Sequence, residues 1–190
     1  MFTRAVTVSL CIAASVALGA QNYKNTVPES FRINGQITDT PGGVAATMTV
    51  QIDKYTPDDE HQAIVNALKA GDNKAFLDVL RNAPVVGALK MNERSVPIRW
   101  ARQQMQQGGS RRIAAMTESP VFFFGAGAVD AKPTEGYDVG VLESTIDTVG
   151  LGKGTMVAAA KVKPGGPTGI EVEDYSGKRI ELTTVTRNKS

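Results

Sequence analysis

The sequence predicts a mainly β protein: an antiparallel meander of about ten strands, closed into a calycin-like barrel or folded into a sandwich, with one helical hairpin packed on it. Apolar residues recur at every second position over most of the chain, which is typical of half-buried strands. The connections between these segments are short and rich in glycine, which favours antiparallel neighbours. The period changes to that of a helix only at about residues 57–83.

The strand-like segments follow one another along the chain. They are residues 29–37, 46–55, 85–91, 96–106, 110–117, 120–126, 137–147, 154–163, 169–175 and 178–186. The first two are expected to form a hairpin across residues 39–43. Residues 150–155, GLGKGT, are expected to be another hairpin turn, because they lack the spacing of a phosphate-binding loop and do not lead into a helix.

The helical hairpin has clear boundary signals. Thr56 is expected to cap the first helix, with Pro57 at its first position and three acidic residues in its first turn. Gly71 then ends this helix, Asp72 caps the second, and Pro84 prevents its continuation. Each helix carries one apolar stripe.

Residues 1–20 have the pattern of a signal peptide: one basic residue, an uncharged apolar run, and the small residues Ala17 and Gly19 before the cleavage position. We therefore expect export, to the periplasm or out of the cell. Residues 21–28 are expected to be a flexible lead-in and residues 29–190 a single β domain. Cleavage would remove Cys11, the one cysteine of the sequence, so the mature chain would form no disulfide.

Composition narrows the chemistry further. The sequence holds one histidine, His61, and 21 basic against 19 acidic residues. A single imidazole excludes multi-histidine metal sites, and the near-neutral charge offers little attraction to nucleic acid. No later segment is suited to span a bilayer. We expect no metal, no cofactor and no nucleic-acid partner, and we expect His61 to be a boundary residue bonded to backbone or to a carboxylate.

Three consecutive phenylalanines stand in the segment SPVFFFGAGA. Strand alternation would place Val121 and Phe123 on one face and Phe122 and Phe124 on the other. Both faces would then be apolar, and an antiparallel sheet needs a cover for its second face. We expect Phe123 to lie beneath the helical hairpin, against Leu68, Phe76 or Leu80. Phe122 and Phe124 would face the interior.

A possible ligand site begins at the strand PIRWARQQ, where alternation would point Ile98, Trp100 and Arg102 the same way. Inside a barrel, Arg102 could hold the acid group of an apolar ligand; the alternative is that it reaches water or a surface carboxylate. The small residues Ala158 and Ala160, predicted on one face with Met156 and Val162, would leave space for a ligand or receive large side chains. Gly140 in the preceding strand adds to that space.

The segments VQIDKYTPDDE, RWARQ, RRIAAMTESP, YDVGVLE and the GKG turn before AAAKVK resemble, in this order, a group of exported bacterial proteins with a strand, helical-hairpin, many-strand layout. This group has no known function. The resemblance therefore implies export and β architecture only.

We predict a non-enzymatic exported domain that binds a small apolar or amphipathic ligand in its interior, with Trp100, Phe122 and Phe124 as walls and Arg102 as an anchor. The alternative is a solid-cored module that acts structurally or binds a protein partner through its surface. A third hypothesis is a hydrolase that uses serine or carboxylates. The glutamates Glu171 and Glu173 are assigned to a solvated strand face and not to catalysis.

Overall fold

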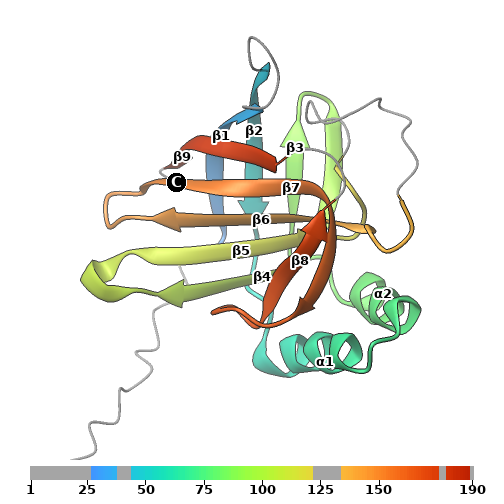
Figure 1. The fold of residues 1–190 in the computed structure, drawn as a ribbon. Helices are drawn as coiled ribbons and strands as arrows, with labels where there is room; N and C mark the ends of the chain where they lie inside the picture. The colour runs from blue at the N-terminus through green and yellow to red at the C-terminus, as the bar shows by residue number, and fades with distance from the viewer. Residues whose placement is uncertain (1–26, 38–43, 122–133, 176–178, 189–190) are drawn as a thin grey trace, which may run out of the picture.

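The computed structural model of the protein describes residues 27–37, 44–121, 134–175 and 179–188 (Figure 1). The strands are β1 (Glu29–Ile37), β2 (Val44–Ile52), β3 (Gly87–Met91), β4 (Arg94–Met105), β5 (Arg111–Thr117), β6 (Val139–Ile146), β7 (Leu151–Pro164), β8 (Ile170–Tyr175) and β9 (Arg179–Arg187), and the helices are α1 (Asp58–Lys69), α2 (Asn73–Asn82) and the short 3-10 turn η1 (Gln107–Gly109).

The strands form a closed antiparallel barrel. Their order in the sheet is β6-β5-β4-β3-β2-β1-β9-β7-β8, and β6 also pairs with β7, so that every strand except β8 belongs to a closed ring. β1 to β3 run steeply in Figure 1, whereas β5 to β7 run across the view. The predicted barrel with a helical hairpin is confirmed.

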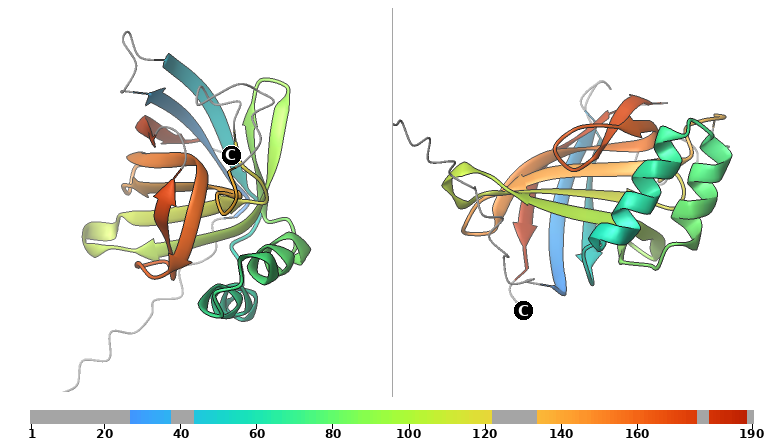
Figure 2. Two further views of the ribbon diagram at one scale, coloured as in Figure 1. Left: turned by 45° about the vertical axis from the view of Figure 1, so that its right-hand side comes forward. Right: turned by 90° about the horizontal axis from the view of Figure 1, so that it is seen from below.

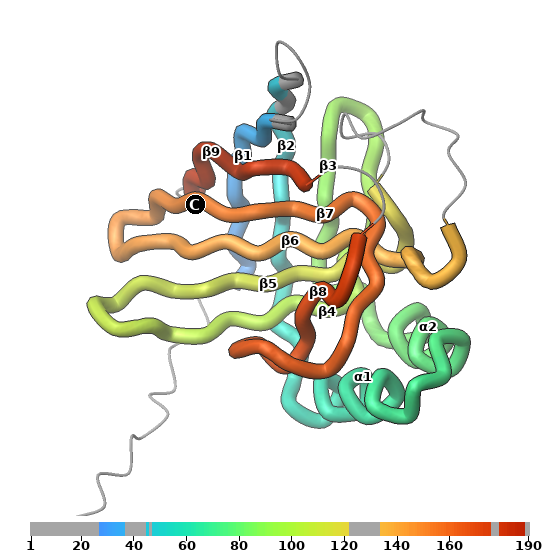
Figure 3. The backbone as a smooth tube through the Cα atoms, in the orientation of Figure 1, coloured from blue at the N-terminus to red at the C-terminus, as the bar shows by residue number. Residues whose placement is uncertain are grey.

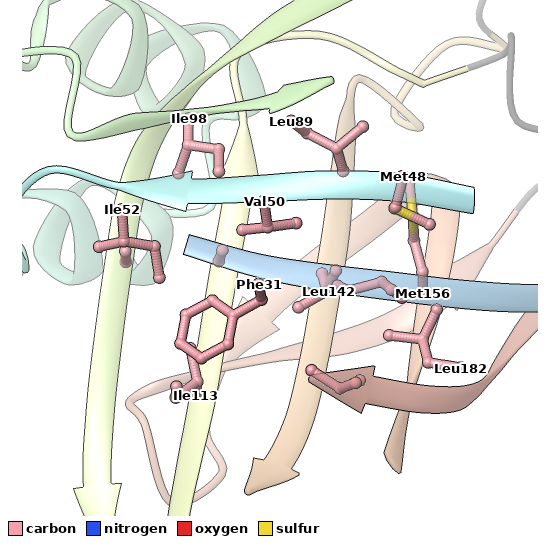
Figure 4. Packing of buried hydrophobic residues seen from close by; sticks show 14 of the residues in the cluster. Phe31, Met48, Val50, Ile52, Leu89, Ile98, Ile113, Leu142, Met156 and Leu182 are labelled. Atoms are coloured by element: carbon pink, nitrogen blue, oxygen red, sulfur yellow. The ribbon is translucent and has the colours of Figure 1, made fainter. Parts of the chain in front are cut away.

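Apolar side chains fill the barrel from all of its strands (Figure 4). This interior cluster consists of Phe31, Ile33, Met48, Val50, Ile52, Val86, Leu89, Val96, Ile98, Ala101, Ile113, Ala115, Val121, Leu142, Ile146, Met156, Ala158, Ile180, Leu182 and Val185. Within the strands they come from alternate positions, as the two-residue period predicts, except where a register shift intervenes, as between Ile98 and Ala101.

A second apolar cluster lies outside the barrel. This outer cluster consists of Ile64, Val65, Phe76, Leu77, Leu80, Trp100, Ala114, Met116, Val139, Val141, Val157, Ala160, Val162 and Ile170. The helical hairpin and β8 cover this part of the barrel wall: Figure 2 shows the helices against the outside of the barrel, and Figure 3 shows β8 in front of β4 and β5. The part of β4 to β7 that the helices and β8 cover is therefore apolar on both faces.

A β-bulge in β4 changes which residues share a face. Ile98 is opposite Thr117 and Trp100 is opposite Met116, so Arg99 is an extra residue. The bulge lies where β4 stops pairing with β3 and begins to pair with β5. Ile98 consequently belongs to the interior cluster and Trp100 to the outer one. The prediction that they point the same way is wrong.

β7 contains a similar irregularity. Val139 is opposite Ala160 and Val141 is opposite Val157, which leaves two residues of β7 facing one of β6. At this point β7 passes from pairing with β9 to pairing with β8. Ala158 faces the interior, but Ala160 lies in the outer cluster. The predicted common face of Met156, Ala158, Ala160 and Val162 is therefore split into two pairs.

The helix boundaries follow the sequence signals with one exception. Gly71 has a left-handed φ of 76°, and the Asp72 side chain accepts from the N–H groups of Lys74 and Ala75, as predicted. Thr56 is not the cap of α1. Pro57 holds that position, and the Thr56 hydroxyl instead accepts the backbone N–H of Ala101, which joins the start of the helix to β4.

The turn between β6 and β7 also differs from the prediction. The chain reverses before β7 begins at Leu151, and the N–H of Gly150 bonds the carbonyl of Asp147. Gly152 and Gly154 lie inside β7, where a Cβ atom would stand 2.2 and 2.1 Å from carbonyl oxygens of β6. Glycine is required there because the two backbones approach closely, not because the chain turns.

Some predictions fall outside the described residues. These include the signal peptide, most of the lead-in, and Phe122, Phe123 and Phe124. Val121, which was predicted to face the helices, is buried in the interior cluster, and its N–H bonds the carbonyl of Ala158. Neither helix of the described part is both long and apolar enough to cross a membrane.

Candidate binding groove on the outer wall of the barrel

The void that the described residues line in the barrel interior around Gly140 is small. A void of about 10 Å³ lies between Val50, Leu89, Ile98, Ala115, Thr117, Gly140, Val141, Leu142 and Met156. That is about the space one water needs, whereas small-molecule pockets occupy roughly 300–1,000 Å³. Gly140 leaves no gap, because an added Cβ would stand 2.7 Å from a methyl of Val121 and 2.8 Å from the Thr117 hydroxyl.

Trp100 lies beneath the helices, outside the barrel. Its side chain is 1 % exposed, and its indole N–H donates to Nδ1 of His61 over 3.0 Å. The ring centroids of the two residues are 6.0 Å apart. The partner of His61 is thus an indole and not the predicted backbone group or carboxylate. Burial, and then the positive charge of Arg102, lower the pKa of His61, so its neutral form is favoured.

Arg102 shares the outer face with Trp100, as alternation predicts for residues two apart. Its guanidinium donates to the Thr56 carbonyl and to Asp58 Oδ1, each over 2.8 Å. Of the two alternatives for Arg102, the one in which it reaches a surface carboxylate is confirmed, because Asp58 is exposed. The two predicted site residues that the structure describes lie together, but beneath and beside α1. Phe122 and Phe124 are outside the described residues.

A buried ionic network occupies one end of the barrel. Glu29 accepts bonds from the Tyr55 hydroxyl and, over 3.0 and 2.9 Å, from the guanidinium of Arg111. Arg187 approaches the same carboxylate at 3.1 Å, and Gln103 accepts from Arg111. Burial, and then the charge of Glu29, raise the pKa of Tyr55 well above its usual range. These groups satisfy one another, so we assign the network to closing the barrel end.

A groove of about 230 Å³ lies beside the outer cluster, under β8. This β8 groove is lined by Val141 and Glu143 of β6, Thr155 and Val157 of β7, Glu171, Val172, Glu173 and Tyr175 of β8, and Arg179 of β9. The strand registers explain the assembly: Glu143 is opposite Thr155, and Val141 is opposite Val157. A valine floor thus borders a polar wall.

Charge is unevenly distributed around the β8 groove. Glu171 and Glu173 form ion pairs with Lys163 and Lys161, at 3.2 and 3.3 Å. The assignment of both glutamates to a solvated strand face agrees with this pairing. Glu143 is half-buried, and within the described part of the chain it has no ion pair or hydrogen-bond partner. Of the three glutamates that line the groove, it is therefore the one without a counter-charge in the described part of the chain.

Cations flank the groove at its edges. Arg179 donates to the Thr155 hydroxyl over 3.1 Å. On the side away from β8, a shallower depression shares Glu143 and Thr155 with the groove and also includes Arg112 and Lys153. Opposite Glu143 on β5 is the small side chain of Ala114, which leaves the carboxylate accessible from that side.

Sequence reasoning did not find Glu143, Tyr175 or Arg179. Each stands on a different strand, and nothing local distinguishes a groove glutamate from any other outward-facing one. The only available signal is the apolar outward position Val141 next to Glu143, which indicates a face that is partly covered. Within the described residues, no three His, Cys, Asp or Glu side chains are grouped as metal ligands would be.

Comparison of the chain with protein-family models, with curated proteins and with solved structures finds no match. The interpretation of the site therefore depends on its geometry.

Proposed function

We propose that this protein is a non-enzymatic binding module with a packed barrel, and that it recognises its partner at the β8 groove. The observation that carries the proposal is the half-buried carboxylate of Glu143 beside a valine floor, in a space of about 230 Å³. Glu143 has no counter-charge among the described residues, and a cationic group of a ligand can supply one through charge-assisted hydrogen bonds.

The chemistry of the groove favours a positively charged group on a short apolar stem. Val141, Val157 and Val172 provide apolar contact for the stem, and Glu143 provides the counter-charge. Tyr175, which is 42 % exposed, stands at the same groove and can contact a cation through its ring. A lysine side chain has these properties.

Two other hypotheses have weaker support. An apolar ligand inside the barrel would need far more space than the void of about 10 Å³ at Gly140. Carboxylate-based hydrolysis uses a pair of acids, whereas Glu171 and Glu173 are bound to lysines and Glu143 stands alone. Native mass spectrometry of the freshly purified protein tests the first: a retained lipid-like mass would favour an interior ligand.

A fragment titration followed by NMR tests the proposal. We expect Nα-acetyl-lysine methylamide to shift the amide resonances of the groove strands, and the norleucine analogue, which lacks the charge, to shift them much less. Glu143→Gln should remove the lysine effect while keeping the side-chain shape. Glu181→Gln is the matched control, because Glu181 lies on the next strand opposite Thr155 but does not line the groove. Equal shifts from both fragments would contradict the proposal.

We also propose that the protein is exported, which the pattern of residues 1–20 supports. Mass spectrometry of protein recovered from the periplasm or medium should give a mature chain that begins at Ala20 or Gln21. A chain that retains residues 1–20 in the cytoplasm would contradict this.

A further inference from the structure

We infer that the partner binds as an extended basic segment that adds a strand to the free edge of β8, with a lysine directed at Glu143. This inference rests on the proposed function of the β8 groove and specifies its ligand.

β8 is at the end of the sheet order. Within the described residues it pairs with β7 alone, over Ile170 to Tyr175. An edge strand has backbone N–H and C=O groups directed away from its neighbour, and an extended peptide can bond to them. The N–H of Tyr175 bonds the carboxylate of Asp174 over 2.8 Å, and the Ile170 carbonyl accepts the Thr168 hydroxyl over 3.5 Å. The edge between them, Glu171 to Asp174, is the part suited to pairing.

Among the described strands, β7 is the one that pairs with β8. Helix α1 approaches the connection between β7 and β8: the imidazole of His61 stands 2.7 Å from the Cβ position of Gly169. On its far side Asp174 accepts the Tyr137 hydroxyl over 2.7 Å. The β8 groove then separates the edge from Glu143 and Thr155 of the barrel wall. An added strand would lie along this groove.

Charge complementarity decides which segment fits. Glu143, Glu171 and Glu173 line the groove against one cation, Arg179. Since Lys161 and Lys163 already neutralise the β8 glutamates, Glu143 sets the requirement for a positive charge. Arg112 and Lys153 lie beyond Glu143 on the side away from β8. An incoming lysine is therefore best placed on the β8 side, where alternation would direct every second side chain of the segment to the wall.

A second copy of this chain is a poorer occupant of the edge. The sequence of β8, IEVEDY, contains no lysine or arginine, so pairing of two β8 strands would bring no cation from the added strand to Glu143.

Three short peptides distinguish strand addition from simple cation binding. The first alternates lysine with threonine; the second replaces each lysine by glutamate; the third has the first sequence with N-methyl groups on alternate backbone nitrogens. We expect the first to bind and to slow hydrogen exchange of the β8 amides. The other two should bind at least about tenfold more weakly. The second peptide loses the positive charge, and the third loses the hydrogen bonds to the β8 backbone.

Variants of the protein complete the test. Glu143→Gln should weaken the lysine peptide by about tenfold, and Glu181→Gln should leave its affinity unchanged. Equal binding of the N-methylated peptide would overturn strand addition and leave the groove proposal standing. Shifts from the lysine fragment without any peptide binding would have the same meaning. If neither the lysine fragment nor the lysine peptide binds, both proposals are wrong. If the protein dimerises with rising concentration and this slows hydrogen exchange in β8, the occupant of the edge is a second copy of the chain and not a basic segment.

Discussion

Glu29 is the central carboxylate of the network at the barrel end, and we predict that Glu29→Gln lowers the free energy of unfolding by about 3 to 5 kcal/mol. The Glu29 side chain is 1 % exposed and that of Arg111 8 %. A glutamine keeps one oxygen as an acceptor, so about two charge-assisted bonds are lost at roughly 1.5 to 3 kcal/mol each. The buried guanidinium of Arg111 then loses the negative charge of Glu29.

Urea unfolding measures this loss, and Trp100, the one tryptophan of the sequence, reports it by fluorescence. With a slope of about 2 kcal/mol per molar urea, the midpoint should fall by roughly 1.5 to 2.5 M. Glu173→Gln is the control: it removes an ion pair with Lys161 whose side chains are 43 % and 52 % exposed, and it should cost less than about 1 kcal/mol. A loss below about 1 kcal/mol for Glu29→Gln would refute the reasoning.

Three further predictions concern the helices and β7. Neutral His61 accepts the Trp100 N–H and has a lowered pKa, so its contribution to stability should be full above about pH 6.5, the usual pKa of histidine, and lost as the pH falls through the lower pKa of the folded state. The wild type should therefore lose its stability advantage over His61→Asn between about pH 7.5 and 5. A difference in unfolding free energy that stays constant over this range would contradict the reasoning. Phe76→Ala should lower the free energy of unfolding in urea by about 3 to 5 kcal/mol and shift the Trp100 emission to the red, because Phe76 packs in the outer cluster with Trp100. Unchanged emission of the folded variant would show that the helices still cover the indole. Gly154→Ala should cost about 1 to 3 kcal/mol or more, because its Cβ would stand 2.1 Å from the Glu143 carbonyl, and a neutral effect on thermal unfolding would contradict that close approach.

Local signals in the sequence account for much of the fold. Alternation identified the strands of the barrel, and Gly71 and Asp72 marked the helical hairpin, because a left-handed glycine and a side-chain cap act within a few residues. Alternation also predicted that helices cover a second apolar face at residues 120–126, but most of that segment lies outside the described residues. The helices of the structure cover the wall of β4 to β7.

Alternation failed at Arg99 and at Ala158–Ala159. At both places one strand exchanges its partner, and the bulge that accommodates this exchange moves every later side chain to the other face. Trp100 was therefore assigned to the interior, although it lies under the helices. No periodic pattern contains this information, because the exchange depends on which distant strands pair.

By itself, the sequence determined the helices and the strands, since these depend on neighbouring residues. Tertiary structure alone decided that the described interior is packed and that Glu143, Tyr175 and Arg179 meet at one groove. These three residues come from β6, β8 and β9, and only the curl of β7, which carries β8 over the barrel wall, brings their side chains together.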